Sequence, residues 1–278
     1  MNNANKKAIG IFDSGLGGLC AVREALKILP DEDIIYFGDT GRVPYGSRSY
    51  ETIKKYARQD MNFLISKNVK MILISCGTVS SVAIDYLRDI FPETPIIGVV
   101  ESACEKAVGI ACESQNKNIG IIATEATISK GMYKKYISEI ALDCGVYSKA
   151  CPLFVPLVEN GHINDDDIIT KSAAELYFGE LKKYNLSSLI LGCTHYPMIK
   201  NIIGEFMGEQ TELIDVGLEA AYRLKTELNG LNLSNGINHN GRLDIYISDE
   251  GLNFKNIASN FLGFDISSEV TKIDIENY

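Results

Sequence analysis

Two of the seven cysteines stand in similar surroundings, each directly after a short apolar run and before small hydroxyl-bearing residues. Cys76 lies in ILISCGTVSS, and Cys193 lies in LILGCTHYP, where His195 follows two residues later. Backbone N–H groups at the start of a helix bind carboxylates and lower the pKa of a thiol. Both cysteines are therefore candidates for acid/base chemistry, although a single buried cysteine is more often a structural residue.

Two thiols that face each other can exchange the proton on a carbon next to a carboxylate. One thiolate removes the α-proton from one face, and the other thiol delivers a proton to the opposite face. Each thiol needs a neighbour that sets its protonation state, and we expect Asp13 beside one thiol and His195 with Glu159 beside the other. A disulfide between Cys76 and Cys193 is the competing interpretation, which a reducing compartment disfavours.

A glycine-rich turn follows the first apolar run, in IFDSGLGGL. It does not match G-x-G-x-x-G because Cys20 stands at the last glycine position, and no Gly-Lys-Ser/Thr follows, so the turn is not typical of a nucleotide site. The turn instead leaves Asp13 and Ser14 at the end of a strand, where a carboxylate and a hydroxyl can reach a small ligand. The alternative is that Asp13 only caps the turn.

A second constrained loop lies in YFGDTGRVPYGSRS. Its glycines and proline fold the backbone tightly, Tyr45 offers a hydroxyl, and Gly46 offers an unobstructed N–H group. Loops of this kind often face ligands. The alternative is a surface turn in which Arg42 and Arg48 are solvated.

Short apolar runs alternate with longer segments of helical periodicity, which is typical of an α/β fold with mainly parallel sheets. The expected strands cover residues 8–12, 34–37, 71–75, 96–100, 118–123, 188–191, 212–215 and 243–248. The expected helices cover residues 19–29, 50–67, 79–90, 129–140 and 165–184.

A weak internal repeat divides the chain. KKAIGIFDSGLGG near the start aligns with KNIGIIATEATISKG in the middle, and the segment around Cys76 aligns with the segment around Cys193. The repeat predicts two pseudo-symmetric α/β lobes, the first formed by residues 1–98 and 213–278 and the second by residues 99–212. Ligands of such sheets bind beyond the carboxyl ends of the strands, so both cysteines would border one cleft between the lobes.

Composition narrows the possible partners. The 278 residues include 27 Lys and Arg against 36 Asp and Glu, a net charge of -9, so nucleic acid and anionic membranes are not expected partners. No apolar run approaches the roughly 20 residues that span a bilayer, and MNNANKKAIG lacks a secretory signal, so we expect a cytoplasmic protein. Seven cysteines without a C-x-x-C pair and only three histidines predict neither a disulfide framework nor a metal site.

The motifs above, taken together, resemble the cofactor-independent glutamate racemases of the aspartate/glutamate racemase superfamily. The resemblance runs through nearly the whole chain, in IGIFDSGLGGL, YFGDTGRVPYG, the Cys76 segment, GVVE, IGIIATEATISKGMY, CPLFVPLVENG, LILGCTHYPMI and NFLGF. It implies a two-lobed enzyme that interconverts L- and D-glutamate without a cofactor and supplies D-glutamate for bacterial peptidoglycan and the cell wall. It also implies an active site between the lobes and a homodimer.

The resemblance assigns roles residue by residue. Cys76 and Cys193 resemble the two catalytic thiols, and Asp13, His195 and Glu159 resemble the supporting acid/base residues. The positions that resemble the family's substrate contacts are Asp13, Ser14, Tyr45, Gly46, Gly77, Thr78, Thr194 and His195. For Glu159 the alternative is a solvated surface carboxylate.

One departure concerns the residue after the first cysteine, where the family usually has Asn and this chain has Gly77. A backbone N–H group of Gly77 can still meet a substrate, but the side-chain hydrogen bond is lost, at a cost of roughly 1.5–3 kcal/mol for a bond to a charged group. Gly77 also predicts a larger pocket, which leaves open a racemase for aspartate or another small amino acid.

Two further classes remain open from the sequence. A non-catalytic amino-acid-binding protein would not need paired bases, and a decarboxylase would need only one thiol, so both thiols together favour racemisation. Nicotinamide and pyridoxal cofactors are not expected, because the dinucleotide fingerprint is incomplete and no lysine lies in the recognised motifs.

Overall fold

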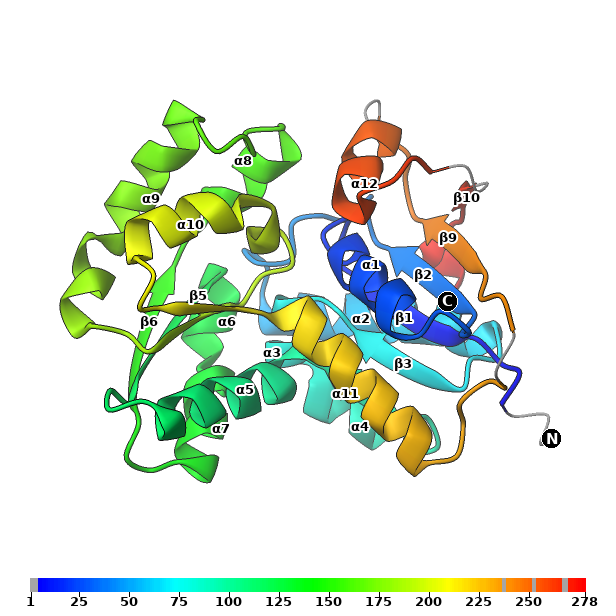
Figure 1. The fold of residues 1–278 in the computed structure, drawn as a ribbon. Coiled ribbons are helices and arrows are strands. Elements are labelled where there is room, and N and C mark those ends of the chain that lie inside the picture. Colours follow the sequence, from blue (N-terminus) through cyan, green and yellow to red (C-terminus); the bar gives the residue numbers. More distant parts are fainter. Residues whose placement is uncertain (1–4, 237–238, 252–253, 267–269) are drawn as a thin grey trace.

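The strands of the chain form two separate sheets, which Figure 1 shows next to each other, each flanked by helices. The computed structural model describes residues 5–236, 239–251, 254–266 and 270–278. Every strand pair in these residues is parallel. The predicted α/β fold with mainly parallel sheets is therefore confirmed.

The first sheet has six strands in the order β10-β9-β2-β1-β3-β4, and the second has four in the order β6-β5-β7-β8. The six strands are β1 (Ile9–Asp13), β2 (Ile34–Gly38), β3 (Met71–Ile74), β4 (Ile96–Gly98), β9 (Leu243–Ile247) and β10 (Val270–Lys272). The four are β5 (Asn118–Ala123), β6 (Gly145–Ala150), β7 (Ser188–Leu191) and β8 (Glu212–Asp215).

The two sheets share one topology at their centres. The order β2-β1-β3-β4 in the first sheet matches the order β6-β5-β7-β8 in the second. The strand that precedes Cys76 is β3, and the strand that precedes Cys193 is β7, so the cysteines occupy equivalent places. This arrangement confirms the pseudo-symmetric lobes predicted from the internal repeat.

Helices connect the strands. They are α1 (Leu19–Ile28), α2 (Tyr50–Ser66), α3 (Gly77–Val82), α4 (Ile84–Ile90), α5 (Val99–Glu113), α6 (Glu125–Lys130), α7 (Met132–Ile140), α8 (Phe154–Glu159), α9 (Ile168–Leu181), α10 (Lys200–Met207), α11 (Val216–Gly230) and α12 (Phe254–Leu262). The short 3-10 helices in the described ranges are η1 (Lys182–Tyr184), η2 (Tyr196–Ile199) and η3 (Ile275–Asn277). Within the described residues, no helix combines the length and apolar character needed to cross a membrane.

Several expected elements have other boundaries in the structure. The expected helix over residues 79–90 is two helices, α3 and α4, which meet at Ala83. Gly131, at φ +70, separates α6 from α7 where one helix over residues 129–140 was expected, because a left-handed residue ends a helix. The expected strand over residues 96–100 ends at Gly98, where α5 begins.

The chain crosses between the lobes twice, and the second crossing lies later than expected. The boundary before residue 213 falls inside β8, which pairs with β7 in the four-stranded sheet. We propose residues 1–98 and 216–278 as the first lobe and residues 99–215 as the second. Helix α11 packs against both α1 and α5 and so joins the two lobes, as Figure 1 shows.

Candidate active site

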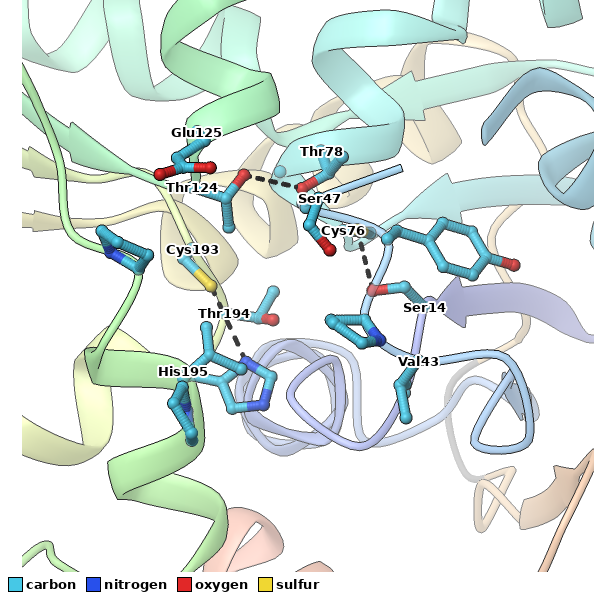
Figure 2. Close-up of a pocket in the computed structure, with 18 of the residues that line it drawn as sticks. Ser14, Val43, Ser47, Cys76, Thr78, Thr124, Glu125, Cys193, Thr194 and His195 are labelled. Carbon is cyan, nitrogen blue, oxygen red and sulfur yellow. Dashed lines mark hydrogen bonds between the residues drawn. The ribbon is translucent and has the colours of Figure 1, made fainter. Parts of the chain in front are cut away.

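A cavity of about 370 Å³ lies between the two lobes at the carboxyl ends of the strands. Figure 2 shows Cys76 and Cys193 on opposite sides of it, each at the end of its own strand. The residues predicted from the sequence that line the cavity are Ser14, Tyr45, Gly46, Cys76, Gly77, Thr78, Glu159, Cys193, Thr194 and His195. The sequence therefore locates the cavity correctly, at the position that parallel sheets favour.

Cys76 is buried and forms the N-cap of α3. Its Sγ lies 3.2 Å from the Oγ of Ser14, which belongs to the turn after β1. Burial and the nearby Asp13 carboxylate raise the pKa of the Cys76 thiol to about 12, although the hydrogen bond with Ser14 opposes this shift. The Cys76 thiol is therefore protonated at neutral pH and can donate its proton.

Cys193 is buried beside His195 in the turn that follows β7. Its Sγ lies 3.7 Å from Nδ1 of His195, and Nε2 of His195 lies 2.9 Å from Oε1 of Glu159 on α8. Burial lowers the pKa of the imidazole, but the bonds to Cys193 and Glu159 outweigh burial and raise the pKa to about 10. A protonated imidazole therefore lies next to the Sγ of Cys193.

Two residues of the segment around α8 have different partners. Glu159 is a bonded partner of His195, with a side chain only 35% exposed, and is not simply a solvated carboxylate. His162, which is close in sequence, instead contacts Asp167 through Nδ1 at 2.9 Å.

Asp13 lies behind the cavity and does not line it. Its Oδ2 accepts hydrogen bonds from the backbone N–H groups of Gly15 and Gly18, both at 3.1 Å, so it caps the turn as the simpler interpretation predicted. It is also close enough to contribute to the raised pKa of Cys76. Burial raises the pKa of the Asp13 carboxyl itself. Asp13 thus combines a structural contact with an electrostatic effect on the Cys76 thiol.

The hydroxyl of Tyr45 is directed away from a ligand, contrary to expectation. It donates to Asp39 and also lies 3.2 Å from Oδ2 of Asp60, and the tyrosine side chain is buried. Arg42 contacts the same two carboxylates, at 2.6 Å and 3.1 Å, so it is not the solvated residue of the alternative interpretation. Tyr45 therefore lines the cavity while its hydroxyl is bonded to these buried carboxyl groups.

Hydroxyl groups from both lobes meet next to Cys76. Oγ1 of Thr78 lies 3.0 Å from Oγ1 of Thr124, which in turn lies 3.0 Å from Oγ1 of Thr127 (Figure 2 shows the first contact). Thr124 was not predicted as a site residue, although the internal repeat aligns it with Ser14. Other cavity residues not identified from the sequence are Gly15, Val43, Pro44, Ser47, Glu125, Pro152, Val155 and Pro156.

The missing side chain of Gly77 does not enlarge the cavity, contrary to expectation. A Cβ at this position would lie inside 3.0 Å of the carbonyl oxygen of Gly192, so the backbone of the other lobe already occupies that space.

Few charged groups line the cavity. In the described part of the chain they are Glu125, Glu159 and His195, and no lysine or arginine is among them. The described residues also contain no group of three or more histidines, cysteines or acidic residues arranged to hold a metal ion. Hydroxyls and backbone N–H groups are therefore the donors that this cavity offers to a carboxylate.

Similar proteins share this fold and this two-lobed arrangement. The crystal structure of glutamate racemase from Francisella tularensis in complex with D-glutamate has a TM-score of 0.90 and 36% identity, and the similarity covers 99% of this chain and 100% of that one. The curated glutamate racemases from Geobacter metallireducens and Thermoanaerobacter sp. are 37% and 40% identical. These two alignments cover 97% and 98% of this chain, and 97% and 99% of the relatives.

The fold and the paired turns around the cavity are those of an amino-acid racemase, which is an isomerase. Residues 20–223 match the Asp/Glu/Hydantoin racemase family, and the chain belongs to that family.

Proposed function

We propose that this chain is a glutamate racemase that interconverts L- and D-glutamate by proton transfer through Cys76 and Cys193. One observation carries this proposal: two thiols on equivalent turns of the two lobes line the same cavity. The names of the similar proteins, and the D-glutamate in the Francisella tularensis structure, support glutamate as the substrate.

The two thiols would act in opposite protonation states. The Cys193 thiolate, beside protonated His195, takes the α-proton, and the electron pair of the broken C–H bond remains on the substrate next to its carboxylate. The Cys76 thiol then delivers its proton to the opposite face of the same carbon. Cys193 ends as a thiol and Cys76 as a thiolate, which is the starting state for the reverse reaction.

The substrate would be held by small groups of both lobes. We assign this binding to the hydroxyls of Ser14, Thr78 and Thr194 and to the backbone of Gly46 and Gly77. The first N–H groups of a helix have no intrahelical partner, so those of α3 can donate hydrogen bonds to the substrate carboxylate. Asp13 and His195 act by setting the charge around the thiols.

The biological setting is also part of the proposal. We propose that the protein works in the cytoplasm without an added cofactor and supplies D-glutamate for peptidoglycan.

We also propose a homodimer, supported by the exposed apolar side chains of Ile168, Ile169 and Leu176 on α9. Light scattering of the purified protein tests the dimer, and a monomer at micromolar concentration would contradict it.

The reaction is tested with purified, reduced protein and L-glutamate in deuterated buffer without added cofactor. Optical rotation should decay to zero, and the α-proton signal should disappear as D-glutamate forms. A parallel reaction with L-aspartate should be much slower. No exchange with glutamate, or faster turnover of aspartate, would contradict the proposed substrate.

A further inference from the structure

Three glycines beside the cavity lie in close contact with the other lobe. A Cβ added to Gly17, Gly46 or Gly77 would in each case lie inside 3.0 Å of an atom of the other lobe. At Gly17 and Gly46 these atoms belong to the side chains of His195, Thr194 and Thr124. At Gly77 the atom is the backbone carbonyl oxygen of Gly192, the residue directly before Cys193. A side chain can rotate away from a new neighbour, but a backbone carbonyl cannot.

Gly192 is held in place by its own sheet. Its N–H group donates to the carbonyl of Ile122 in β5 at 2.7 Å. A Cβ on Gly192 would lie only 2.9 Å from that same carbonyl oxygen and 3.1 Å from the Cβ of Ala123. Gly192 is therefore both hydrogen-bonded to the end of β5 and closely packed against it.

The turn that carries Gly77 is equally fixed. The Oγ of Ser80 donates to the carbonyl of Ile74 at 3.0 Å and accepts from the N–H group of Val99 at 3.2 Å, and Ser80 is buried. The N–H group of Ser80 also donates to the carbonyl of Cys76 at 2.9 Å. Because neither turn can yield locally, a side chain at position 77 would have to separate the lobes at the site.

We propose that Gly77 is a positioning residue that sets the distance between the two thiols, because the missing Cβ lets the Cys76 turn close onto the Cys193 turn. This inference rests on the proposed two-thiol reaction. Proton transfer to opposite faces of one carbon needs both sulfur atoms within reach at once, and a misplacement of about 1 Å can cost about 100-fold in rate. The Asn that the related family usually has at this position would not fit between these two turns.

The test compares Gly77→Ala and Gly77→Asn with Gly179→Ala, a helical glycine of α9 whose added Cβ would meet nothing within 4 Å. Both position-77 variants should lose about 10- to 100-fold in kcat with a smaller change in KM, and the control should match the wild type. Wild-type rates in Gly77→Ala, or faster turnover in Gly77→Asn through a regained hydrogen bond to the substrate, would overturn the proposal.

Solvent deuterium separates a positioning effect from partial unfolding. If Cys76 lies too far away, the deprotonated substrate persists while the Cys193 thiol exchanges its proton for solvent deuterium, and the substrate more often regains its starting configuration with deuterium. The ratio of deuterium in recovered L-glutamate to D-glutamate formed should then rise in Gly77→Ala. A smaller folded fraction would lower both quantities equally and leave the ratio unchanged, which would contradict the proposal.

A crystal structure of Gly77→Ala tests the positioning role of Gly77 without a measurement of enzyme activity. The distance between Sγ of Cys76 and Sγ of Cys193 should be longer than in the wild type, and an equal distance would overturn the proposal. If the wild-type protein does not racemise glutamate, the proposed function fails, whereas this measurement still tests Gly77.

Discussion

Cys76 and Cys193 are chemically similar residues in different surroundings. The pKa of Cys76 is raised to about 12 by burial and Asp13, whereas Cys193 faces an imidazole whose own pKa is raised to about 10. At neutral pH the Cys76 thiol is therefore a proton donor, whereas Cys193 lies next to a cationic imidazole. The pseudo-symmetry of the fold does not extend to these neighbours.

Replacement of Glu159 by Gln tests the surroundings of Cys193. The change removes the carboxylate bonded to His195 and so lowers the pKa of the imidazole. The basic limb of the kcat/KM profile against pH should move to lower pH, and at pH values above the wild-type limb the rate should fall about tenfold for each unit by which the pKa drops. Glu125→Gln, the other carboxylate at the cavity, is the matched control and should leave the profile in place. An unchanged basic limb in Glu159→Gln would contradict the role assigned to Glu159.

For individual residues, the sequence predicted which groups are reactive better than it predicted their hydrogen-bond partners. Both thiols and His195 stand in recognisable motifs, so their presence at the cavity follows from strand ends and the repeat. The hydroxyl of Tyr45 turns toward buried carboxylates because Asp60 comes from α2, a contact that no local motif encodes. Thr124 was missed because a threonine directly before a helix is typical of an N-cap, and its hydroxyl does accept from the N–H group of Thr127.

Among the elements, the loop between β2 and α2 depends on a buried charge cluster. Arg42 bonds Asp39 and Asp60, both fully buried, and its Nη1 lies 3.1 Å from Glu276 in η3 near the C-terminus. The same loop carries Tyr45 and Gly46 to the cavity. Residues distant in sequence therefore hold one wall of the site.

Arg42→Ala should destabilise the protein strongly, because two buried carboxyl groups would lose their cation. The expected loss in the free energy of unfolding is roughly 3–5 kcal/mol, as for one partner of a buried ion pair. Urea denaturation measures it. The control is Arg48→Ala, an exposed arginine of the same loop, with an expected change within about 0.5 kcal/mol. Equal effects of the two substitutions would contradict this account of the loop.

Strands were easier to predict than helix ends. β1, β2 and β3 are buried along their whole length, so they appear in the sequence as uninterrupted apolar runs. β6 is only partly buried and its segment, GVYSKA, lacks such a run, so it was not predicted. α5 was missed because Val99 and Val100 extend the apolar run of β4, and periodicity cannot locate the change from strand to helix there.

For the whole molecule, stability should decline at basic pH. His195 has an ordinary pKa of 6.5 that is raised to about 10 in the folded protein, so its contribution is complete below 6.5 and is lost as pH rises toward 10. Burial also raises the pKa of Asp13 and Asp215, and for these acids too stability falls as pH rises. Urea unfolding at pH 6.5, 8 and 9.5 measures the decline.

His195→Asn isolates the imidazole contribution, because this variant cannot carry the titrating proton. Its stability should fall less between pH 6.5 and 9.5 than that of the wild type. Parallel curves for the two proteins would show that His195 titrates equally in the folded and unfolded states, contrary to the expected pKa.

The two-lobed architecture was predictable because the repeat duplicates a whole strand order. The distance between the lobes was not, because it depends on where glycines of one lobe meet atoms of the other. The second boundary was misplaced because β8 and α11 are continuous in sequence, and only the pairing of β8 with β7 assigns that strand to the second sheet.

The most direct test of the two-thiol reaction is α-proton exchange in Cys76→Ala and Cys193→Ala, measured separately with L- and D-glutamate in deuterated buffer. Each variant keeps one of the two thiols, so α-proton exchange in each should be confined to one enantiomer, and in Cys193→Ala it should increase with pH because the pKa of Cys76 is raised to about 12. The two variants should select opposite enantiomers, and neither should racemise. Cys112→Ala, at an exposed cysteine, should behave as the wild type. Racemisation by either single variant, or exchange of the same enantiomer by both, would contradict the account.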